Sequence, residues 1–159
     1  MGGLKGEETG TIDGVVLKRL VVHPDERGRL FEGLRSDDPM FRKFGQVYVT
    51  TARPGVIKAW HYHKVQTDYF FCIQGTARLV LYDPRVKSPT TGMVSEFIMV
   101  AENPALVMIP PNVYHGFQCV SGIEAIMLNI PTEPYLVNAP DEYRLDPYSE
   151  EVPYAWPKA

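Results

Sequence analysis

The stretch that decides the fold is Gly55-Val-Ile-Lys-Ala-Trp-His61-Tyr-His63-Lys-Val-Gln-Thr-Asp68-Tyr-Phe-Phe-Cys-Ile-Gln-Gly75. His61 and His63 are two residues apart, so on a β-strand both imidazoles lie on one face and the neighbouring aromatic residues lie on the other. A Gln-Thr turn then reverses the chain, and Asp68 opens the next strand, where it can lie opposite the histidines. Two imidazoles and one carboxylate on one face form a suitable ligand set for a divalent transition metal.

A second segment, far along the chain, supplies a further imidazole. It is Met108-Ile-Pro-Pro-Asn-Val-Tyr-His115-Gly-Phe, in which a strand enters a Pro-Pro-Asn turn and the chain emerges again at His115. Apolar residues surround this histidine, which indicates a polar ring that faces a cavity. We therefore expect three imidazoles to converge, although each histidine could also be an ordinary structural residue. The candidate ligands for Zn, Mn, Fe or Ni are His61, His63, Asp68 and His115.

The remainder of the chain consists of short β-rich runs separated by turn residues, which is typical of a β-sandwich or barrel. Helical periodicity is nearly absent, and the best helical candidate is the stretch 38–44, with Pro39 at a first-turn position. The fourth histidine, His23, is predicted to lie in a loop because a Pro-Asp pair follows it. Strands without long helices between them pair antiparallel, so the predicted fold class is all-β. The predicted strands are 14–22, 29–34, 45–51, 57–63, 69–73, 77–83, 95–100, 105–109, 116–120 and 124–130.

The length of 159 residues fits one domain. We expect a flexible N-terminus over residues 1–10 and a barrel over residues 11–131. The C-terminal extension, residues 132–159, is rich in Pro, Tyr and acidic residues and lacks strand periodicity. It is expected to pack on the barrel or on a partner subunit.

The composition excludes several classes of protein. The formal net charge is −3 and the basic residues are scattered, which argues against a nucleic-acid binder and against a membrane-surface helix. No apolar run reaches the roughly 18 residues of a membrane span, and the N-terminus lacks the apolar core of a secretory signal.

Cys72 and Cys119 lie in strand-like runs and are expected to be buried apolar residues, with Cys119 the candidate to face the cavity. A cytoplasmic location is the expectation.

The two histidine segments resemble the two signature motifs of the cupin superfamily. The slots of the first motif are filled by Gly55, His61, His63, Asp68 and Gly75, with Asp where the superfamily usually has Glu. The second motif, Pro-x-Gly-x-x-His, is matched by Pro110, Asn112 and His115. Asn in the Gly slot is the residue that best tolerates the positive φ that Gly permits. The resemblance implies a double-stranded β-helix, the cupin jelly roll, with a short peripheral helix or turns.

From about Gly14 to Pro157 the chain resembles one branch of that superfamily, the dTDP-4-dehydrorhamnose 3,5-epimerases. The segments that carry this resemblance are Asp25-Glu-Arg-Gly-Arg-Leu-Phe-Glu32, Gln46, the His61 strand, Ser88-Pro-Thr-Thr-Gly92, Ala101-Glu-Asn103, Ile109 to Phe117, and Trp156-Pro157. The substrate-binding residues that it implies are Arg27, Glu32, Gln46, Lys58, Asn129 and Tyr135.

The family's chemistry is proton abstraction next to a keto group. A His acts as base, an Asp orients it, a Lys steadies the enolate oxygen, and a Tyr returns the proton from the opposite face. The resemblance places His61 at the base and retains His115, which makes both of them catalytic candidates.

The sequence departs from this family pattern at several positions. Asp68 stands where the family has its Lys, Asn129 where it has its Tyr, and Lys58 where it has an Arg. The family's orienting Asp belongs to a segment beyond the Trp-Pro that this sequence does not include, and Glu133 or Asp141 are the candidates to replace it.

Three functions remain open on the sequence. The first is an epimerase or isomerase that acts on a keto-deoxysugar nucleotide, with a metal ion replacing the missing Lys as Lewis acid or without one. The second is a metal-dependent cupin of other chemistry, an oxygenase or a small-acid isomerase. The third is a non-catalytic sugar-binding cupin. The expected partners are a small-molecule substrate, a nucleotide sugar, and a second copy of the chain, because cupin barrels have open sheet edges that dimers close.

Overall fold

The computed structural model describes residues 7–9 and 12–158, and within these ranges the chain forms strands and turns but no helix. The strands are β1 (Glu7–Thr9), β2 (Val16–Arg19), β3 (Val22–Asp25), β4 (Gly28–Phe31), β5 (Tyr48–Ala52), β6 (Ile57–Tyr62), β7 (Asp68–Gln74), β8 (Thr76–Tyr82), β9 (Val94–Val100), β10 (Ala105–Ile109), β11 (Tyr114–Cys119), β12 (Ala125–Asn129) and β13 (Tyr143–Arg144). The all-β prediction is confirmed.

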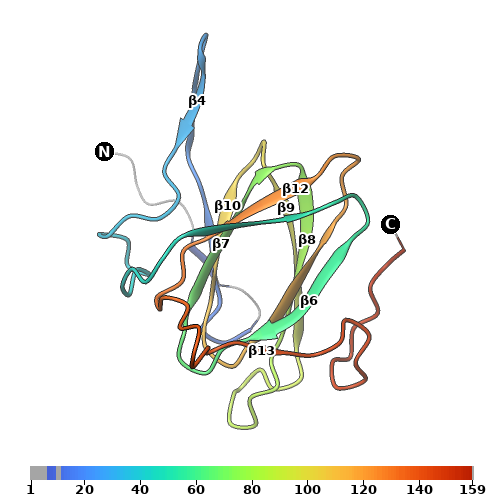
Figure 1. Ribbon diagram of the computed structural model, residues 1–159. Helices are drawn as coiled ribbons and strands as arrows, with labels where there is room; N and C mark the ends of the chain where they lie inside the picture. The colour runs from blue at the N-terminus through green and yellow to red at the C-terminus, as the bar shows by residue number, and fades with distance from the viewer. Residues whose placement is uncertain (1–6, 10–11, 159) are drawn as a thin grey trace.

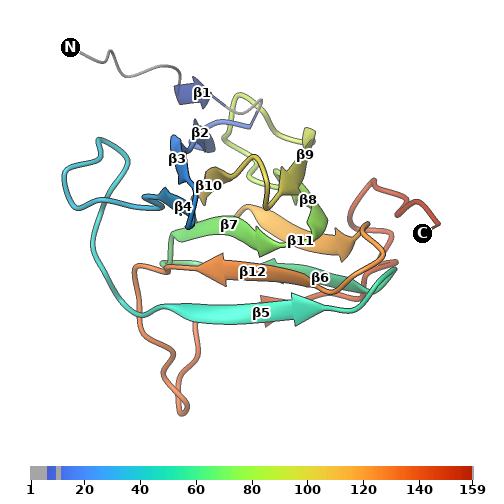
Figure 2. The ribbon, with the colours of Figure 1, turned by 90° about the horizontal axis from the view of Figure 1, so that it is seen from above.

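Two antiparallel sheets form the barrel. One has the strand order β1-β2-β10-β7-β12-β5, and the other has the order β13-β6-β11-β8-β9 (Figures 1 and 2). The short hairpin of β3 and β4 projects away from the barrel body (Figure 1). This is the jelly-roll architecture that the cupin motifs predicted.

The space between the sheets holds an apolar core. Side chains alternate between the two faces of each strand, so every second residue of a barrel strand points inward. Inward residues such as Leu79, Leu81, Val107 and Met127 are at most 1% exposed. Burial of each side chain of this size stabilises the fold by about 1.5–3 kcal/mol, and together these side chains hold the two sheets against each other.

The C-terminal residues pack against the outer side of β6. The backbone of Leu145 exchanges two hydrogen bonds with that of Trp60, and β13 pairs with the end of β6, with Arg144 opposite His61. Trp60 and Trp156 are in ring contact, with centroids 5.1 Å apart. These contacts bring the residues just before β13 to the edge of the barrel cavity. The two-residue strand β13 escaped the sequence interpretation because it is too short to show periodicity.

Several local predictions were wrong. The stretch 38–44 is a turn followed by irregular chain and not a helix, because the carboxylate of Asp38 bonds to the backbone N–H of Arg35 and to Lys18 instead of starting a helix. The predicted strand 14–22 is divided between β2 and β3, and Leu20, which lies between them, bonds to Pro104. His23 lies on β3, exposed, and not in a loop. Residues 1–6 and 10 of the predicted flexible N-terminus lie outside the described residues, whereas 7–9 pair with β2 as β1.

No helix in the described part of the chain has the length and apolar character that a membrane crossing requires.

Candidate active site

A cavity of about 580 Å³ opens between the two sheets of the barrel. Its walls come from β5 of one sheet, from β6 and β11 of the other, and from residues 134–144 of the C-terminal segment. The predicted site residues that line it are Gln46, Lys58, His61, His63, His115 and Tyr135. Side chains from distant parts of the sequence therefore meet in one concave site of the size that binds small molecules.

The two histidine segments are joined by their backbones. His61 lies directly opposite His115 in the antiparallel pair of β6 and β11. Asn112 has φ 63°, the left-handed value expected for the Gly slot of the second motif, and its N–H donates to the carbonyl of His63 at 2.7 Å. Next to His115, Gly116 lets the two strands approach closely, since a Cβ there would overlap Ala59. The pairing is irregular at this point, which is common beside functional sites.

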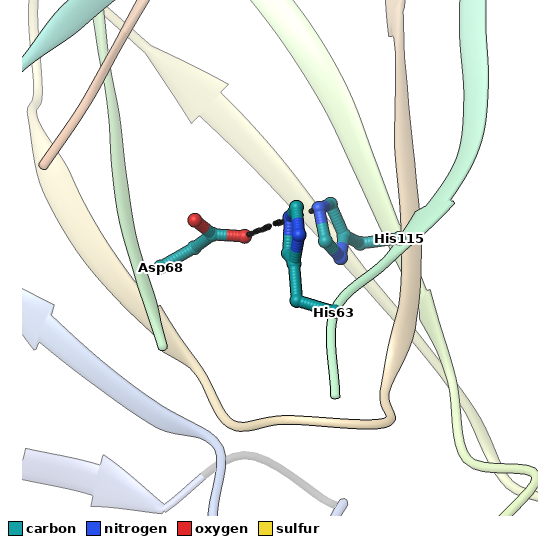
Figure 3. A group of neighbouring side chains, drawn as sticks. All are labelled: His63, Asp68 and His115. Carbon is teal, nitrogen blue, oxygen red and sulfur yellow. Dashed lines mark ion pairs between the residues drawn. The ribbon is translucent and has the colours of Figure 1, made fainter. Parts of the chain in front are cut away.

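His63, Asp68 and His115 form a buried cluster (Figure 3), and the two histidines also line the cavity. Oδ2 of Asp68 lies 3.1 Å from Nε2 of His63 and 3.4 Å from Nε2 of His115. Oδ1 of the same carboxylate accepts hydrogen bonds from the side-chain amides of Gln66 at 2.7 Å and Asn129 at 2.8 Å. Asp68 is 1% exposed, so its charge is held entirely by these neighbours.

Nδ1 of both histidine rings is hydrogen-bonded to a backbone carbonyl. Nδ1 of His63 contacts the carbonyl of Asp141, and Nδ1 of His115 lies 3.2 Å from the carbonyl of Val113. Each carbonyl accepts a hydrogen bond from Nδ1–H, so in the neutral rings the lone pairs of Nε2 face Oδ2 of Asp68, which has no hydrogen bond of its own. Nε2 of His63 also lies 3.2 Å from the side-chain nitrogen of Gln66, which can donate to it. The close approach of Oδ2 to both Nε2 atoms favours a cation between them, either a proton or a metal ion.

The pKa values follow from the same contacts. Burial lowers the pKa of His63, but the hydrogen bond and charge of Asp68 raise it more, so it lies above its usual value. Burial raises the pKa of Asp68, and its contacts with His63 and the charge of His115 outweigh this and bring it below its usual value. Burial lowers the pKa of His115 to about 4, so this ring is neutral at neutral pH.

The donor set and its spacing fit a divalent metal ion. Metal–ligand distances of about 2.0–2.2 Å separate neighbouring ligand atoms by roughly 2.8–3.6 Å, depending on whether the geometry is octahedral or tetrahedral, and the contacts of Oδ2 with the two imidazoles fall in this range. The backbone carbonyls on both Nδ1 atoms are the supports that metal-binding histidines usually have. The predicted four-ligand set is reduced, however. Within the described residues the ligand atoms of His63, Asp68 and His115 gather within 4.8 Å, and His61 does not join them.

His61 has a different partner, Glu142, which comes from the C-terminal segment. Nδ1 of His61 lies 3.4 Å from Oε1 of Glu142, and the ring centroid is 6.3 Å from that of His115. Oε1 of Glu142 also accepts from Arg144, at 2.7 Å from Nη2. Burial lowers the pKa of His61, and the charge of Glu142 offsets part of this effect. A neutral imidazole whose Nδ1 faces a carboxylate presents the lone pair of Nε2, which is the arrangement of a general base.

Neither of the two acids predicted from the sequence to orient the base lies next to His61. Glu133 pairs with Lys43 at 2.6 Å. The carboxylate of Asp141 accepts three backbone N–H groups, from Lys64 at 2.7 Å and from Val65 and Gln66 at 2.9 Å each. Asp141 thus shapes the turn between β6 and β7, and the acid beside the base is its neighbour in sequence.

A hydrogen-bonded chain leads from Asp68 to the cavity wall. Asn129, at the end of β12, is fully buried, and Nδ2 donates to Asp68 and, at 2.9 Å, to the hydroxyl of Tyr48. Oδ1 of Asn129 accepts from the N–H of Tyr69. Tyr48 lines the cavity, whereas Asn129 lies behind it. The sequence interpretation missed Tyr48 and Glu142, because no motif marks either residue and only the strand pairings bring them to the site.

The remaining substrate-binding candidates divide into two groups. Gln46, Lys58 and Tyr135 line the cavity, and Oε1 of Gln46 accepts from the N–H of Tyr135 at 3.2 Å. Arg27 and Glu32 do not line it: they belong to the region of the projecting hairpin, where they pair with Asp25 and Arg35. Their role in binding stays a prediction.

Both cysteines are free and buried, as the sequence analysis favoured. Cys119 does not line the cavity: its thiol donates to the carbonyl of Ile123 at 3.2 Å.

Comparisons with known proteins agree on one family. The family model of dTDP-4-dehydrorhamnose 3,5-epimerase matches residues 9–157. The chain is 38% identical to the spore coat polysaccharide biosynthesis protein SpsL of Bacillus subtilis, over 91% of this chain and 96% of that protein. It is 35% identical to a probable low-salt glycan biosynthesis epimerase of Haloferax volcanii, over 86% of this chain and 88% of that protein.

Solved structures support the same assignment. A dTDP sugar isomerase from Desulfovibrio desulfuricans superposes with a TM-score of 0.86 at 32% identity, over 91% of this chain and 92% of that one. ChmJ, a 3'-monoepimerase from Streptomyces bikiniensis solved with dTDP-quinovose, superposes with a TM-score of 0.83 at 26% identity, over 94% and 78%. On the family match and these identities, the chain belongs to the dTDP-4-dehydrorhamnose 3,5-epimerase family.

Proposed function

We propose that the protein is an epimerase that inverts a carbon next to the keto group of a nucleotide-linked keto-deoxysugar. The observation that carries this proposal is the pair of His61 and Glu142 in the cavity wall of a chain from this family. Relatives described as epimerases, and one solved with a dTDP-sugar, support the class of substrate.

In the proposed reaction, Nε2 of His61 removes the proton from the carbon beside the carbonyl. Glu142 holds the ring through Nδ1 and stabilises the imidazolium that forms, as a carboxylate does for a catalytic histidine in other enzymes. Arg144 binds the same carboxylate and keeps it in place.

The enolate oxygen that forms needs positive charge close to it. Lys58 and Arg144 both line the cavity and are the cations available for this role. Asp68, at the position of the family's Lys, does not oppose it: its two oxygens are turned toward Gln66, Asn129 and the two imidazoles. The negative charge of Asp68 is therefore balanced by these neighbours and does not face the enolate.

His115 has a supporting role in this proposal. Its Nε2 faces Asp68 and its ring is neutral, since burial lowers its pKa to about 4. It completes the buried cluster against which the base is packed and is not itself the group that removes the proton.

The test is incubation of the purified protein with dTDP-4-keto-6-deoxyglucose in deuterated buffer, followed by NMR and mass spectrometry. We expect deuterium at a carbon next to the keto group and formation of an epimer. If neither appears, with or without added divalent metal, the proposed function is overturned.

A second proposal concerns the buried cluster. We infer that His63, Asp68 and His115 hold a divalent ion of the Zn, Mn, Fe or Ni class, on the strength of three convergent acceptor atoms with ligand spacing. A metal bound there would act as a Lewis acid on a substrate carbonyl. Elemental analysis of the purified protein tests this directly: we expect about one ion per chain that disappears in His63→Ala. Metal-free protein with full activity would show that a proton occupies the cluster.

Two further proposals concern the protein in its cell. We propose a homodimer, because strand β5 lies at the edge of its sheet with Val47 and Val49 exposed nearby. Light scattering of the purified protein tests the oligomeric state. We also propose a cytoplasmic location, which the two free, buried cysteines support and which fractionation tests.

A further inference from the structure

Inversion at a carbon requires two groups on opposite faces of the substrate: one that removes a proton and one that returns it. His61 provides the first group from β6. The position where the family has its donating tyrosine is Asn129 in this chain, and an amide cannot donate a proton as a phenol can. A proton donor on the opposite wall of the cavity is therefore unassigned.

Tyr48 lies on that opposite wall. It is on β5, in the sheet that faces the one carrying His61, and both side chains line the cavity. Lys58 of β6 reaches across to Thr50 of β5 at 2.7 Å, so the two strands face each other at this point. A sugar ring in the cavity would have the imidazole on one side and the phenol on the other.

The hydrogen bonds of Asn129 leave the hydroxyl of Tyr48 able to donate its proton to a ligand. The N–H of Tyr69 can only donate, which fixes Oδ1 of Asn129 as its acceptor, and ionised Asp68 can only accept, which fixes Nδ2 as the donor. Nδ2 therefore also donates to the hydroxyl oxygen of Tyr48. Because this oxygen accepts from within the protein, its own O–H is available to a ligand in the cavity.

We propose that Tyr48 is the general acid of the reaction and that Asn129 positions it; this assignment rests on the proposed function. After His61 has removed the proton, the electron pair of the enolate forms a new C–H bond with the proton of Tyr48, whose O–H bond breaks. Nδ2 of Asn129 stabilises the phenolate, which regains a proton from water while His61 releases its own to water. Atoms and charge balance without any further reactant.

The electrostatics of the site keep Tyr48 protonated. Burial, followed by the negative charges of Asp68 and Glu142, raises the pKa of Tyr48. The hydroxyl is therefore protonated at neutral pH and enters the reaction as an acid. Tyr48 is 37% exposed, and the other phenol that lines the cavity, Tyr135, is 53% exposed.

The test is Tyr48→Phe, which removes the hydroxyl and keeps the ring. With dTDP-4-keto-6-deoxyglucose in deuterated buffer, we expect His61 still to remove the substrate proton and to return deuterium on the same face. Recovered substrate should carry deuterium with its configuration retained, while epimer formation falls by about 100-fold or more. Tyr148→Phe, in which an exposed phenol is lost, is the matched control and should change neither rate.

The outcomes separate the two proposals. Epimer formation at the wild-type rate in Tyr48→Phe, or loss of exchange and inversion together in a folded variant, would overturn the assignment of Tyr48. Exchange without inversion in Tyr135→Phe instead of Tyr48→Phe would move the role to that residue. Absence of exchange in the wild-type protein would overturn the proposed function, and the assignment with it.

Discussion

Replacing Asp141 with Ala is expected to destabilise the protein, whereas replacing its neighbour Glu142 with Gln is expected to impair only catalysis. The carboxylate of Asp141 accepts three backbone N–H groups in the turn after β6, and its carbonyl contacts Nδ1 of His63. Hydrogen bonds to a charged group contribute about 1.5–3 kcal/mol each, and partial exposure of this turn reduces the value. We expect the free energy of unfolding to fall by about 2–4 kcal/mol.

Urea denaturation followed by circular dichroism measures this change directly. In a chain of this size the expected loss corresponds to a fall in Tm of about 4–16 °C. Asp141→Asn, which keeps one acceptor oxygen, should fall between the wild type and Asp141→Ala.

Glu142→Gln is the matched comparison, since the same assay should show it within about 0.5 kcal/mol of the wild type. Its rate of deuterium exchange should fall by about 10- to 100-fold, part of the 10²–10⁴-fold effect of a positioned base. An Asp141→Ala variant as stable as the wild type, or a Glu142→Gln variant with full activity, would refute this division of roles.

Three more perturbations test the framework. Asp83→Asn should lower stability by about 2–3 kcal/mol at neutral pH. Burial raises the pKa of Asp83, but hydrogen bonds from neighbouring side chains lower it below its usual value. The stability that the ionised carboxylate contributes is therefore present above about pH 4 and is lost as the pH falls through the lowered pKa, so the wild type and the variant should converge in urea titrations at acid pH. Trp156→Ala should cost about 3 kcal/mol, because this ring packs on Trp60; a Tm unchanged by the substitution would contradict that packing. Gly116→Ala should lower stability by about 1–3 kcal/mol and reduce activity, because its Cβ would overlap Ala59 and separate the strands of the two catalytic-site histidines; full activity would argue against that coupling.

The sequence predicts the barrel and its motif residues because these depend on local chemistry. The two-residue spacing of His61 and His63 requires only an extended chain, which β6 provides as far as Tyr62. The Gly slot of the second motif requires a residue that accepts positive φ, and Asn112 does so with φ 63°. Such patterns can be read along the chain, and they placed three imidazoles in one cavity.

The site residues that the sequence did not predict depend on contacts between distant segments. Glu142 reaches His61 only because the two-residue strand β13 pairs with β6. Tyr48 reaches Asn129 only because β5 and β12 are aligned in register. His61 was expected among the metal ligands because of its two-residue spacing from His63, but β6 ends at Tyr62, so His63 lies beyond the strand that carries His61, and His61 lies beside Glu142.

The same contacts resolve the competition for His61. As a metal ligand it could not also be the free base. The structure gives the buried cluster to His63, Asp68 and His115 and leaves His61 with a carboxylate beside Nδ1. A metal ion and a catalytic base can therefore coexist in one cavity.

The most direct test of the account is the deuterium exchange of a His61→Asn variant, measured with dTDP-4-keto-6-deoxyglucose in deuterated buffer beside the wild type. We predict that the variant folds normally and loses both exchange and epimer formation by at least about 100-fold. Exchange at the wild-type rate without this imidazole would contradict the assignment of His61 as the base.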